Sequence, residues 1–447
     1  MPDPSRILVI GAGFAGTHLV RALARLLPKE ISVTLVSDES YTTFNPMLPE
    51  AVGASVFPEQ VIVPVREMLP RDGPQQFIMG AVTALDRTKR ELICRTLAGD
   101  IVLGYDHLVL AIGSRARLDL LPGMAGQALP LKTVGDAMHI RNTVLRRLAR
   151  IELESNAALR RSLGHFIVIG GGFSGVEVAG ELIDCLHSIR RYYPRVAADE
   201  LKVTVLHGLG RLLPELSPRL AASALASLEK RGVRVRLETR AESMSAEGVR
   251  LAGGEIVIGQ TVICTVGTSS NPLLERLGLP LHQGRVIVGG DMAVPNHPGL
   301  WAIGDCACVP NAFDGSHAPP TAQFAVREAR VLAANLRDAL AGKPTRPFRY
   351  RSRGMMASIG HRKGVAEVAG IALTGWPAWL VWRAYYLSQI PTRSRRWRIA
   401  FEWVLGMFYP PDITHLRFTR SHEMLADERR RQREHVLETE SAVATAR

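Results

Sequence analysis

The chain carries two copies of one glycine pattern, and this repeat constrains its fold more than any other feature. One copy runs from Arg6 to Gly16 and the other from Phe166 to Gly175, and in both a short apolar run leads into the glycines. The glycines are Gly11, Gly13 and Gly16 in the first copy, and Gly170, Gly172 and Gly175 in the second. In such a strand–turn–helix unit the first glycine permits a tight turn, the second lets backbone approach a pyrophosphate, and the third lets the helix pack on the strand. The helix N-terminus then faces the phosphates. A single copy can be an ordinary tight turn, but two copies predict an α/β protein with two Rossmann-like domains, each binding one dinucleotide.

Length and composition agree with this architecture. At 447 residues the chain is long enough for about three domains, and a hydrophobic fraction of 47% is typical of globular proteins. The five cysteines show no C-x-x-C and no zinc spacing, which indicates a reducing compartment and no metal site. The first strand begins by Arg6, so we expect no signal peptide ahead of it. The net charge of +13 favours an anionic partner such as a nucleotide, a nucleic acid or a membrane surface, although a basic solvated surface would give the same total.

The first domain continues as a βαβ unit. Residues 17–27 predict a helix and residues 31–36 a second strand. A dinucleotide domain usually ends this strand with an acid that holds a ribose hydroxyl. Ser37 occupies that place and Asp38 follows, so Asp38 is either the ribose contact or an ordinary turn aspartate. Residues 105–113 predict a buried parallel strand that ends in glycine.

A helical connector over 132–163 leads to the second domain, with Arg141, Arg146 and Arg147 expected on a solvated face. The second strand of this domain, residues 202–207, ends in His207, and residues 261–267 predict its closing strand. An acid at a strand end accepts a bond from the ribose hydroxyl and repels a 2′-phosphate, whereas histidine does neither firmly. His207 therefore leaves the choice between NADH and NADPH open.

Residues 300–305 return to the pattern of short strand, glycine and aspartate. Beside two glycine turns, this segment is typical of a chain that rejoins its first domain, where Asp305 would bond the ribityl chain of a flavin. The alternative is a plain Gly-Asp turn. Residues 320–327 then begin a helix whose N-terminus can point at the flavin ring.

The segment from about Pro347 onward differs in character, because five of the six tryptophans lie there. Its apolar run, residues 368–382, is shorter than the roughly 20 residues that span a bilayer. Residues 397–408 show apolar side chains at helical spacing, and an arginine cluster over 393–398 precedes and overlaps them. This composition is typical of a helix lying in the membrane interface. A helix pair packing on the protein's own core, or on a second subunit, is the alternative. From about Ser421 the chain is charge-rich and predicts a solvated tail.

Taken together, these segments resemble the type II NADH dehydrogenases, the single-chain NADH:quinone oxidoreductases that bind the membrane from one side. The resemblance covers nearly the whole chain. Its carriers include both glycine turns and residues 44–50, and its more particular carriers are residues 322–325, 356–363 and 373–382. It implies FAD in the first domain, formed by 1–131 and 282–346, and a nicotinamide cofactor in the second, 132–281. It implies further that 347–420 is a membrane-associating helical region, followed by a charged tail over 421–447.

The resemblance also assigns roles to residues. The expected FAD contacts are Gly11, Gly13, Phe14, Ala15, Gly16, Asp38, Gly113, Gly304, Asp305, Ala322 and Gln323. The expected NAD(P)H contacts are Gly170, Gly172, Phe173, Ser174, Gly175, Glu177, His207 and Gly267. Glu177, Gln323 and Lys363 are the expected catalytic residues, beside the nicotinamide, at the meeting of flavin and quinone, and near the flavin. Three departures from the family pattern are Ser37 and His207 at the strand ends, and Arg327 in place of a second glutamine of the quinone motif.

The resemblance thus implies an FAD enzyme that takes a hydride from NADH, or NADPH, and gives two electrons to a membrane quinone without pumping protons. It would be a peripheral protein on the cytoplasmic side of the inner membrane, docked through 371–408, with a possible homodimer and no nucleic-acid partner. Two alternatives stay open. A sulfide:quinone oxidoreductase shares the two-domain plan but needs redox cysteines at other positions. A nucleotide-binding regulator of the same fold would have lost turnover, and His207 and Arg327 favour it.

Overall fold

The first sheet carries the first glycine turn. The computed structural model describes residues 5–70, 73 and 75–416. Its seven-stranded sheet has the order β21-β8-β1-β2-β5-β6-β7, in which the strands from β21 to β5 run parallel and β5, β6 and β7 form an antiparallel meander. The strands are β1 (Arg6–Ile10), β2 (Ser32–Ser37), β5 (Gln75–Asp86), β6 (Glu91–Thr96), β7 (Gly99–Gly104), β8 (His107–Leu110) and β21 (Leu300–Ala302). Since β21 pairs with β8, the chain rejoins this sheet after the second domain, as its motif indicated.

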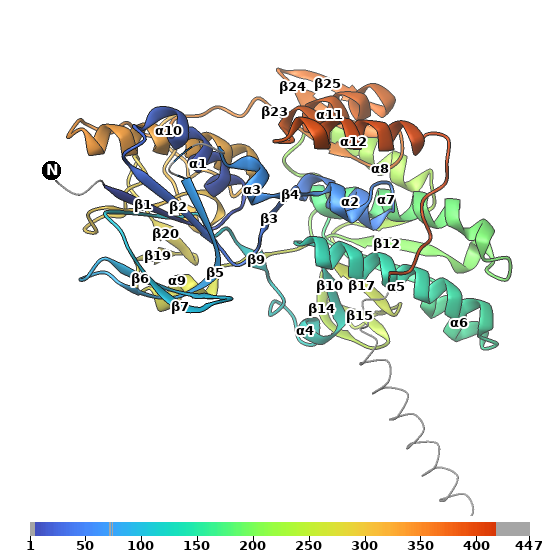
Figure 1. Cartoon of the computed structure of the whole chain (residues 1–447). Coiled ribbons are helices and arrows are strands. Elements are labelled where there is room, and N and C mark those ends of the chain that lie inside the picture. Colours follow the sequence, from blue (N-terminus) through green and yellow to red (C-terminus); the bar gives the residue numbers. More distant parts are fainter. Residues whose placement is uncertain (1–4, 71–72, 74, 417–447) are drawn as a thin grey trace, which may run out of the picture. The chain divides into compact units, whose positions relative to one another are not determined.

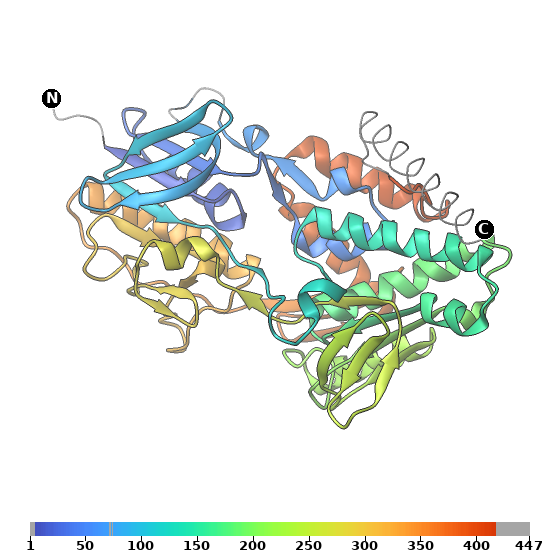
Figure 2. The ribbon, with the colours of Figure 1, turned by 90° about the horizontal axis from the view of Figure 1, so that it is seen from below.

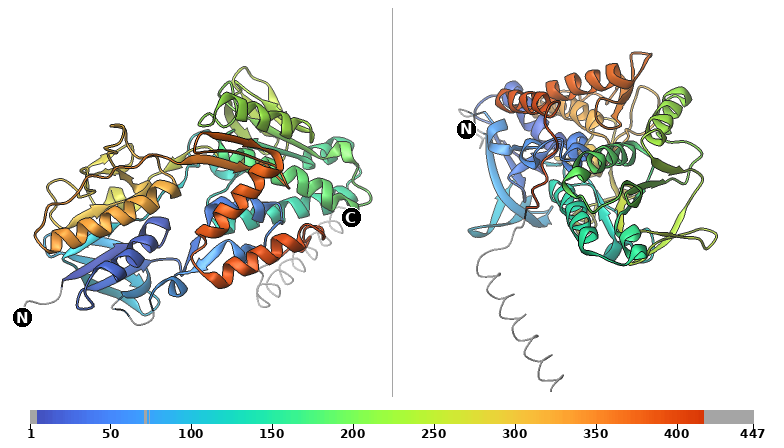
Figure 3. Two further views of the ribbon diagram at one scale, coloured as in Figure 1. Left: turned by 90° about the horizontal axis from the view of Figure 1, so that it is seen from above. Right: turned by 90° about the vertical axis from the view of Figure 1, so that its right-hand side faces the viewer.

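Helices α1 (Phe14–Leu26) and α10 (Ala322–Leu340) lie side by side on this sheet (Figures 1 and 3). Their apolar faces share one core with β1, β2 and β8. The smaller elements of this half are β3 (Tyr41–Thr43), β4 (Ile62–Pro64), α3 (Val65–Met68), α9 (Pro272–Arg276), β19 (Leu281–His282), β20 (Arg285–Ile287) and β22 (Ala307–Cys308).

The second sheet carries the second glycine turn and is parallel throughout, in the order β10-β17-β11-β12-β13. Its strands are β10 (Ala128–Pro130), β11 (His165–Ile169), β12 (Lys202–Leu206), β13 (Val233–Arg236) and β17 (Thr261–Cys264). Helices α5 (Val134–Leu153), α6 (Ala157–Leu163), α7 (Phe173–Ile189) and α8 (Pro218–Glu229) accompany it (Figure 2). A short helix α4 (Met124–Gln127) and the antiparallel strands β14 (Ala241–Ser245), β15 (Gly248–Leu251) and β16 (Ile256–Ile258) complete this half.

One expectation for α5 is wrong. Arg141 is only 3% exposed, and its guanidinium donates to the carbonyl oxygen of Asp412 at 2.9 Å. This arginine therefore ties the end of the C-terminal region to the connector helix. Arg147 also departs from the expectation, because its guanidinium donates to the side chain and the carbonyl oxygen of Gln260 at 2.9 Å and 3.0 Å, whereas Arg146 is exposed.

Two short strands mark the places where the chain crosses between the two halves. β9 (Arg115–Ala116) follows the first sheet, β18 (Thr268–Ser269) follows the second, and the two pair antiparallel. The Arg117 N–H also donates to the Gly267 carbonyl oxygen at 3.4 Å. The crossings therefore form one hydrogen-bonded ribbon.

The C-terminal region begins with strands. β23 (Gly354–Ser358), β24 (Gly364–Val368) and β25 (Ile371–Thr374) form an antiparallel sheet, and helices α11 (Gly375–Gln389) and α12 (Arg393–Leu405) follow. Both helices lie near α7 and the short helix α2 (Leu48–Val52) (Figure 1). The apolar run over 368–382 is thus a strand and half a helix, and within the described residues no helix is long and apolar enough to cross a membrane.

The tryptophans of this region divide into two groups. Trp379, Trp382 and Trp403 are at most 7% exposed and pack in the protein's own core, the alternative that the sequence left open. Trp376 and Trp397 are 54% and 77% exposed. The tail over 421–447 lies outside the described residues.

Candidate functional site

The first glycine turn and the helix start that follows the second one line a cavity of about 1650 Å³. The first half contributes residues 10–15 and 304–305, and the second contributes Phe173, Ser174 and Glu177 of α7 together with residues 264–267. The start of α10, including Ala322 and Gln323, and the loop residues 43–46 and 48–49 line the same space. The cavity wall therefore includes nearly all of the expected FAD residues but only half of the expected NAD(P)H residues.

The three glycines of each turn differ in what surrounds them. Gly11 and Gly170 have φ angles of +101° and +114°, in the left-handed region that favours glycine. A Cβ on Gly11 would lie 2.4 Å from the Ala111 carbonyl oxygen, whereas a Cβ on Gly13 or Gly172 would meet nothing within 4 Å. The space beside the second glycine of each turn is thus open, which is what a pyrophosphate pressed against the backbone requires.

The helices that leave these turns have uncapped N-termini. Gly13 and Gly172 precede α1 and α7, and neither helix receives a hydrogen bond from a capping side chain. First-turn N–H groups have no partner within a helix, so they are available to phosphate oxygens. The residues at both helix starts fit dinucleotide phosphates.

At the end of β2, Ser37 is the last strand residue, and its hydroxyl accepts a hydrogen bond from the Glu39 N–H at 3.3 Å. Ser37, Asp38 and Glu39 all line the cavity. Burial raises the pKa of Glu39, and neighbouring Asp38 raises it further. Sequence reasoning missed Glu39 because it lies two positions beyond the strand end.

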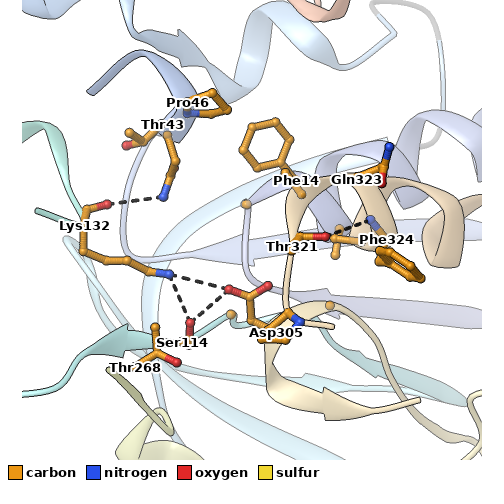
Figure 4. A pocket seen from close by; sticks show the side chains of 18 of the residues that line it. Phe14, Thr43, Pro46, Ser114, Lys132, Thr268, Asp305, Thr321, Gln323 and Phe324 are labelled. Atoms are coloured by element: carbon orange, nitrogen blue, oxygen red, sulfur yellow. Dashed lines mark hydrogen bonds and ion pairs between the residues drawn. The ribbon is translucent and has the colours of Figure 1, made fainter. Parts of the chain in front are cut away.

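A polar network lies where the cavity approaches Asp305 (Figure 4). The Ser114 hydroxyl donates to Asp305 Oδ2 at 2.9 Å, and Lys132 Nζ lies 3.1 Å from Ser114 Oγ and 3.5 Å from Asp305 Oδ2. The amide of Asn45 approaches the Lys132 carbonyl oxygen at 3.4 Å. The sequence indicated Asp305 alone, because Lys132 and Ser114 belong to segments that meet it only in the fold.

The N-terminus of α10 points into the cavity (Figure 4). Thr321 caps it by accepting the Phe324 N–H at 3.5 Å, and Gln323 Oε1 accepts from the Ser352 hydroxyl at 3.1 Å. Arg327 lies over the Tyr350 ring, 5.2 Å from its centroid. The arginine that departs from the family's quinone motif therefore lines the cavity with its charge against an aromatic face.

His207 has a different place from the acid it replaces. Its Nδ1 accepts the Gly171 N–H at 3.1 Å, so the ring holds the second glycine turn. Burial lowers the pKa of His207, which keeps the ring neutral. His207, Gly16, Gly170, Gly172 and Gly175 are absent from the cavity wall, whereas Gly113, Gly267 and Gly304 line it.

Three buried glutamates gather behind the second glycine turn. Glu50 of α2 and Glu177 and Glu181 of α7 are 1%, 7% and 3% exposed, and only Glu177 reaches the cavity. Glu177 Oε1 accepts the Ser358 N–H at 3.1 Å, and Glu181 Oε2 accepts the Ser55 hydroxyl at 2.8 Å. Burial raises the pKa of Glu177 well above its usual range and that of Glu181 to about 8. Glu181 is therefore mostly protonated at neutral pH, and burial favours the protonated form of Glu177.

The third glutamate is paired with an arginine of the C-terminal region. Arg383 of α11 donates to Glu50 Oε1 at 3.0 Å, and the Trp403 indole N–H donates to Glu50 Oε2 at 3.2 Å. The guanidinium lies between the rings of Trp379 and Trp403, 4.2 Å and 4.3 Å from their centroids. Helices α11 and α12 thus hold a buried charge against α2.

Lys363, an expected catalytic residue, does not line the cavity. Its Nζ donates to the His361 carbonyl oxygen at 3.0 Å and lies 3.9 Å from Asp184 Oδ2. This placement does not support a role beside the flavin, because the ammonium lies against Asp184 of α7 and not in the cavity wall.

The five cysteines are all free and buried. Burial raises the pKa of both Cys185 and Cys306 to about 12, so neither thiol ionises near neutral pH. In the part of the chain that the structure describes, no group of three or more His, Cys, Asp or Glu side chains is placed to hold a metal ion.

Three comparisons place the chain among known proteins. The family model described as pyridine nucleotide-disulphide oxidoreductase matches residues 5–329. A type II NADH:quinone oxidoreductase of Mycobacterium tuberculosis is 28% identical over 414 residues, which cover 89% of this chain and 86% of that protein.

Two solved structures share the fold. NDH2 of Plasmodium falciparum in complex with NADH superposes with a TM-score of 0.84 at 18% identity, covering 92% of this chain and 99% of that one. The sulfide:quinone oxidoreductase of Aquifex aeolicus superposes with a TM-score of 0.67 at 16% identity, covering 93% and 100%. The α/β fold with two dinucleotide-binding halves is confirmed, as is the resemblance to the type II enzymes. Since the family model matches most of its length, this chain belongs to the pyridine nucleotide-disulphide oxidoreductase family.

Proposed function

We propose that the protein oxidises NADH or NADPH through a bound FAD and passes two electrons to a membrane quinone. The similar protein of Mycobacterium tuberculosis is named a type II NADH:quinone oxidoreductase. The observation that carries this proposal is the single cavity lined by the first glycine turn, by the start of α7 directly after the second, and by the start of α10. A donor nucleotide held at α7 and a flavin held at α1 then share one space, so that a hydride can pass between them.

The residues present fit FAD in the first half. The open face of Gly13 and the uncapped start of α1 would hold the pyrophosphate, and Asp305 with Lys132 would hold the ribityl chain. When bound, the flavin supplies the two-electron chemistry that protein side chains lack. The N-terminus of α10 at Gln323 directs its partial positive charge into the cavity, which stabilises negative charge there.

Glu177 is suited to handle a proton at the cavity. Because burial favours the protonated form of its carboxyl and this carboxyl lines the cavity, Glu177 can donate a proton from one oxygen while Oε1 stays fixed by the Ser358 N–H. A carboxylic acid kept neutral by burial is a usual proton donor at pH 7.

The quinone would enter from the side of the C-terminal helices. Tyr385, Tyr386 and Gln389 of α11 line the cavity. Trp397 and Phe401 of α12 and Phe408 in the turn after it are 77%, 65% and 77% exposed. Exposed aromatics beside arginines are typical of a helix that lies in a membrane interface. The proposal is therefore a peripheral membrane enzyme that transfers electrons without pumping protons, and a homodimer stays a prediction.

The sulfide:quinone alternative is disfavoured by the buried, protonated thiols, since sulfide oxidation in that class needs accessible cysteines. The regulator alternative is disfavoured by the cavity that extends from the first glycine turn to Phe173, Ser174 and Glu177 at the start of α7.

The test is anaerobic mixing of the purified, flavin-containing protein with NADH, followed by a soluble quinone. We expect the flavin absorbance to bleach within the mixing time of a stopped-flow instrument and to return when quinone is added. A protein without flavin, or a flavin that sulfide reduces and neither nucleotide does, would refute the proposal.

A further inference from the structure

The place where a dinucleotide-binding domain distinguishes NADH from NADPH is the end of its second strand, here the end of β12. An acid there binds the ribose hydroxyls, and a nearby arginine accommodates a 2′-phosphate. His207 occupies the acid's position, but its Nδ1 is committed to the Gly171 N–H and its ring is neutral. The strand end therefore offers no charge that would repel a phosphate.

Arg240, in the segment that follows β13, fills the space beside this end of β12. Gly208 follows His207 and has no side chain, and a Cβ placed on it would lie 3.3 Å from Arg240 Cγ and 3.8 Å from Arg240 Nε. Arg240 thus covers the position directly after the missing acid. The backbone fixes this approach, because the Thr239 N–H donates to the His207 carbonyl oxygen at 2.8 Å.

The guanidinium of Arg240 is exposed and, among the residues that the structure describes, makes no ion pair and no side-chain hydrogen bond. It lines a hollow of about 380 Å³ with Arg236, Glu238 and Glu255. Arg236 is bound to Glu255 through two bonds of 2.6 Å and 2.8 Å, which leaves Arg240 and Glu238 as the charges available to a ligand.

Glu238 is the competing group, because its carboxylate could take the ribose hydroxyls and select NADH. Its Oε1 lies 3.7 Å from where a Cβ on Gly210 would stand, two residues further along the loop than the contact of Arg240. Resting on the function proposed above, we propose that Arg240 binds the 2′-phosphate of NADPH and that the enzyme accepts NADPH as an electron donor alongside NADH.

The test compares anaerobic flavin reduction by NADPH and by NADH in the flavin-loaded wild-type protein and in three variants. We expect the second-order rate constant for NADPH to lie within tenfold of that for NADH. Arg240→Leu should lower the NADPH value tenfold or more and the NADH value less than threefold, because only the 2′-phosphate meets the guanidinium. Arg234→Leu removes an exposed arginine from β13 and is the matched control, with both values changed less than threefold.

A binding measurement separates this inference from the proposed function. In the flavin-loaded protein we expect 2′,5′-ADP to bind at least tenfold more tightly than 5′-AMP, and Arg240→Leu to abolish that difference. If neither nucleotide reduces the flavin but this binding pattern holds, the proposed function and the use of NADPH as electron donor both fail, and the binding of the 2′-phosphate by Arg240 stands. If NADH reduces the flavin and NADPH does so more than tenfold more slowly, the inference is overturned. It is also overturned if Glu238→Gln lowers the NADH value tenfold while Arg240→Leu leaves NADPH unchanged.

Discussion

Replacing Arg383 with methionine removes one buried charge while leaving most of the side-chain volume in place. The methionine chain can still lie between the rings of Trp379 and Trp403, since thioethers pack well on aromatic rings. What disappears is the guanidinium that donates to Glu50 at 3.0 Å. Glu50 is 1% exposed, so it would keep only the Trp403 indole N–H as a donor.

Breaking a buried ion pair in this way typically costs about 3–5 kcal/mol, because one charge is left uncompensated. The unfolding entropy of a cooperative unit as long as residues 1–412 is about 0.9 kcal/mol per kelvin, so Tm should fall by about 3–6 °C. Differential scanning calorimetry of the flavin-loaded protein measures the shift, with urea unfolding as a check where heating is irreversible.

The pH dependence of the loss has a definite sign. Burial raises the pKa of Glu50, and the Arg383 guanidinium opposes that rise, so the variant has the higher pKa. A buried carboxyl with a raised pKa stabilises the fold while protonated and loses that contribution as pH rises through the folded-state pKa. The loss of unfolding free energy in Arg383→Met should therefore be larger at pH 9 than at pH 6.

The double variant Glu50→Gln/Arg383→Met is the control, because the glutamine amide carries no charge and still accepts the Trp403 N–H. It should recover more than half of the lost stability at pH 9. An unchanged Tm in Arg383→Met, or a double variant no more stable than the single one, would refute the reasoning that an isolated charge is the source of the cost.

Three further predictions concern the cavity and its surroundings. Glu177→Gln keeps the size of the side chain but cannot give up a proton, so turnover with quinone should fall about tenfold or more, while anaerobic flavin reduction by NADH should stay within about threefold of wild type, as measured by stopped-flow absorbance. Lys363→Ala should change the rates of flavin reduction and reoxidation less than about twofold in stopped-flow experiments, because the ammonium lies against Asp184 outside the cavity; a tenfold loss would restore its expected role. Trp397→Ser with Phe401→Ser should reduce co-sedimentation with lipid vesicles by about tenfold or more, and leave activity with a soluble quinone intact.

The parts of the fold that the sequence predicted are those whose signals are local. Each glycine turn contains its own strand, turn and helix start, so both Rossmann-like halves and the return of β21 to the first sheet could be expected. The three strands between Gly354 and Thr374 could not, because β24 and β25 form a hairpin whose apolar residues merge with those of α11 into one run. Hydrophobicity alone does not divide such a run into strand and helix.

The residues of the candidate site also fall into those that a local motif predicts and those that only the fold brings together. Asp305 and Gln323 belong to recognisable motifs, but Ser114 and Lys132 reach Asp305 from segments that are far from it in sequence. Arg383 meets Glu50 across a separation of 333 residues, and no local pattern indicates that pairing. For Lys363, the motif predicts a role near the flavin, while its ammonium donates to the His361 carbonyl oxygen outside the cavity wall, so this role stays a prediction.

The antiparallel ribbon of β9 and β18 determines how the two halves can move. The only two chain crossings within residues 105–300 are hydrogen-bonded to each other, so the halves cannot slide past one another without breaking that ladder. Ser55 and Glu50 also bind Glu181 and Arg383, so a rotation of one half about the ribbon must break these contacts or carry them along. If the ribbon acts as the hinge, amide hydrogen exchange at Arg117, whose N–H donates to the Gly267 carbonyl oxygen, should stay slow during turnover while amides at the cavity rim exchange faster.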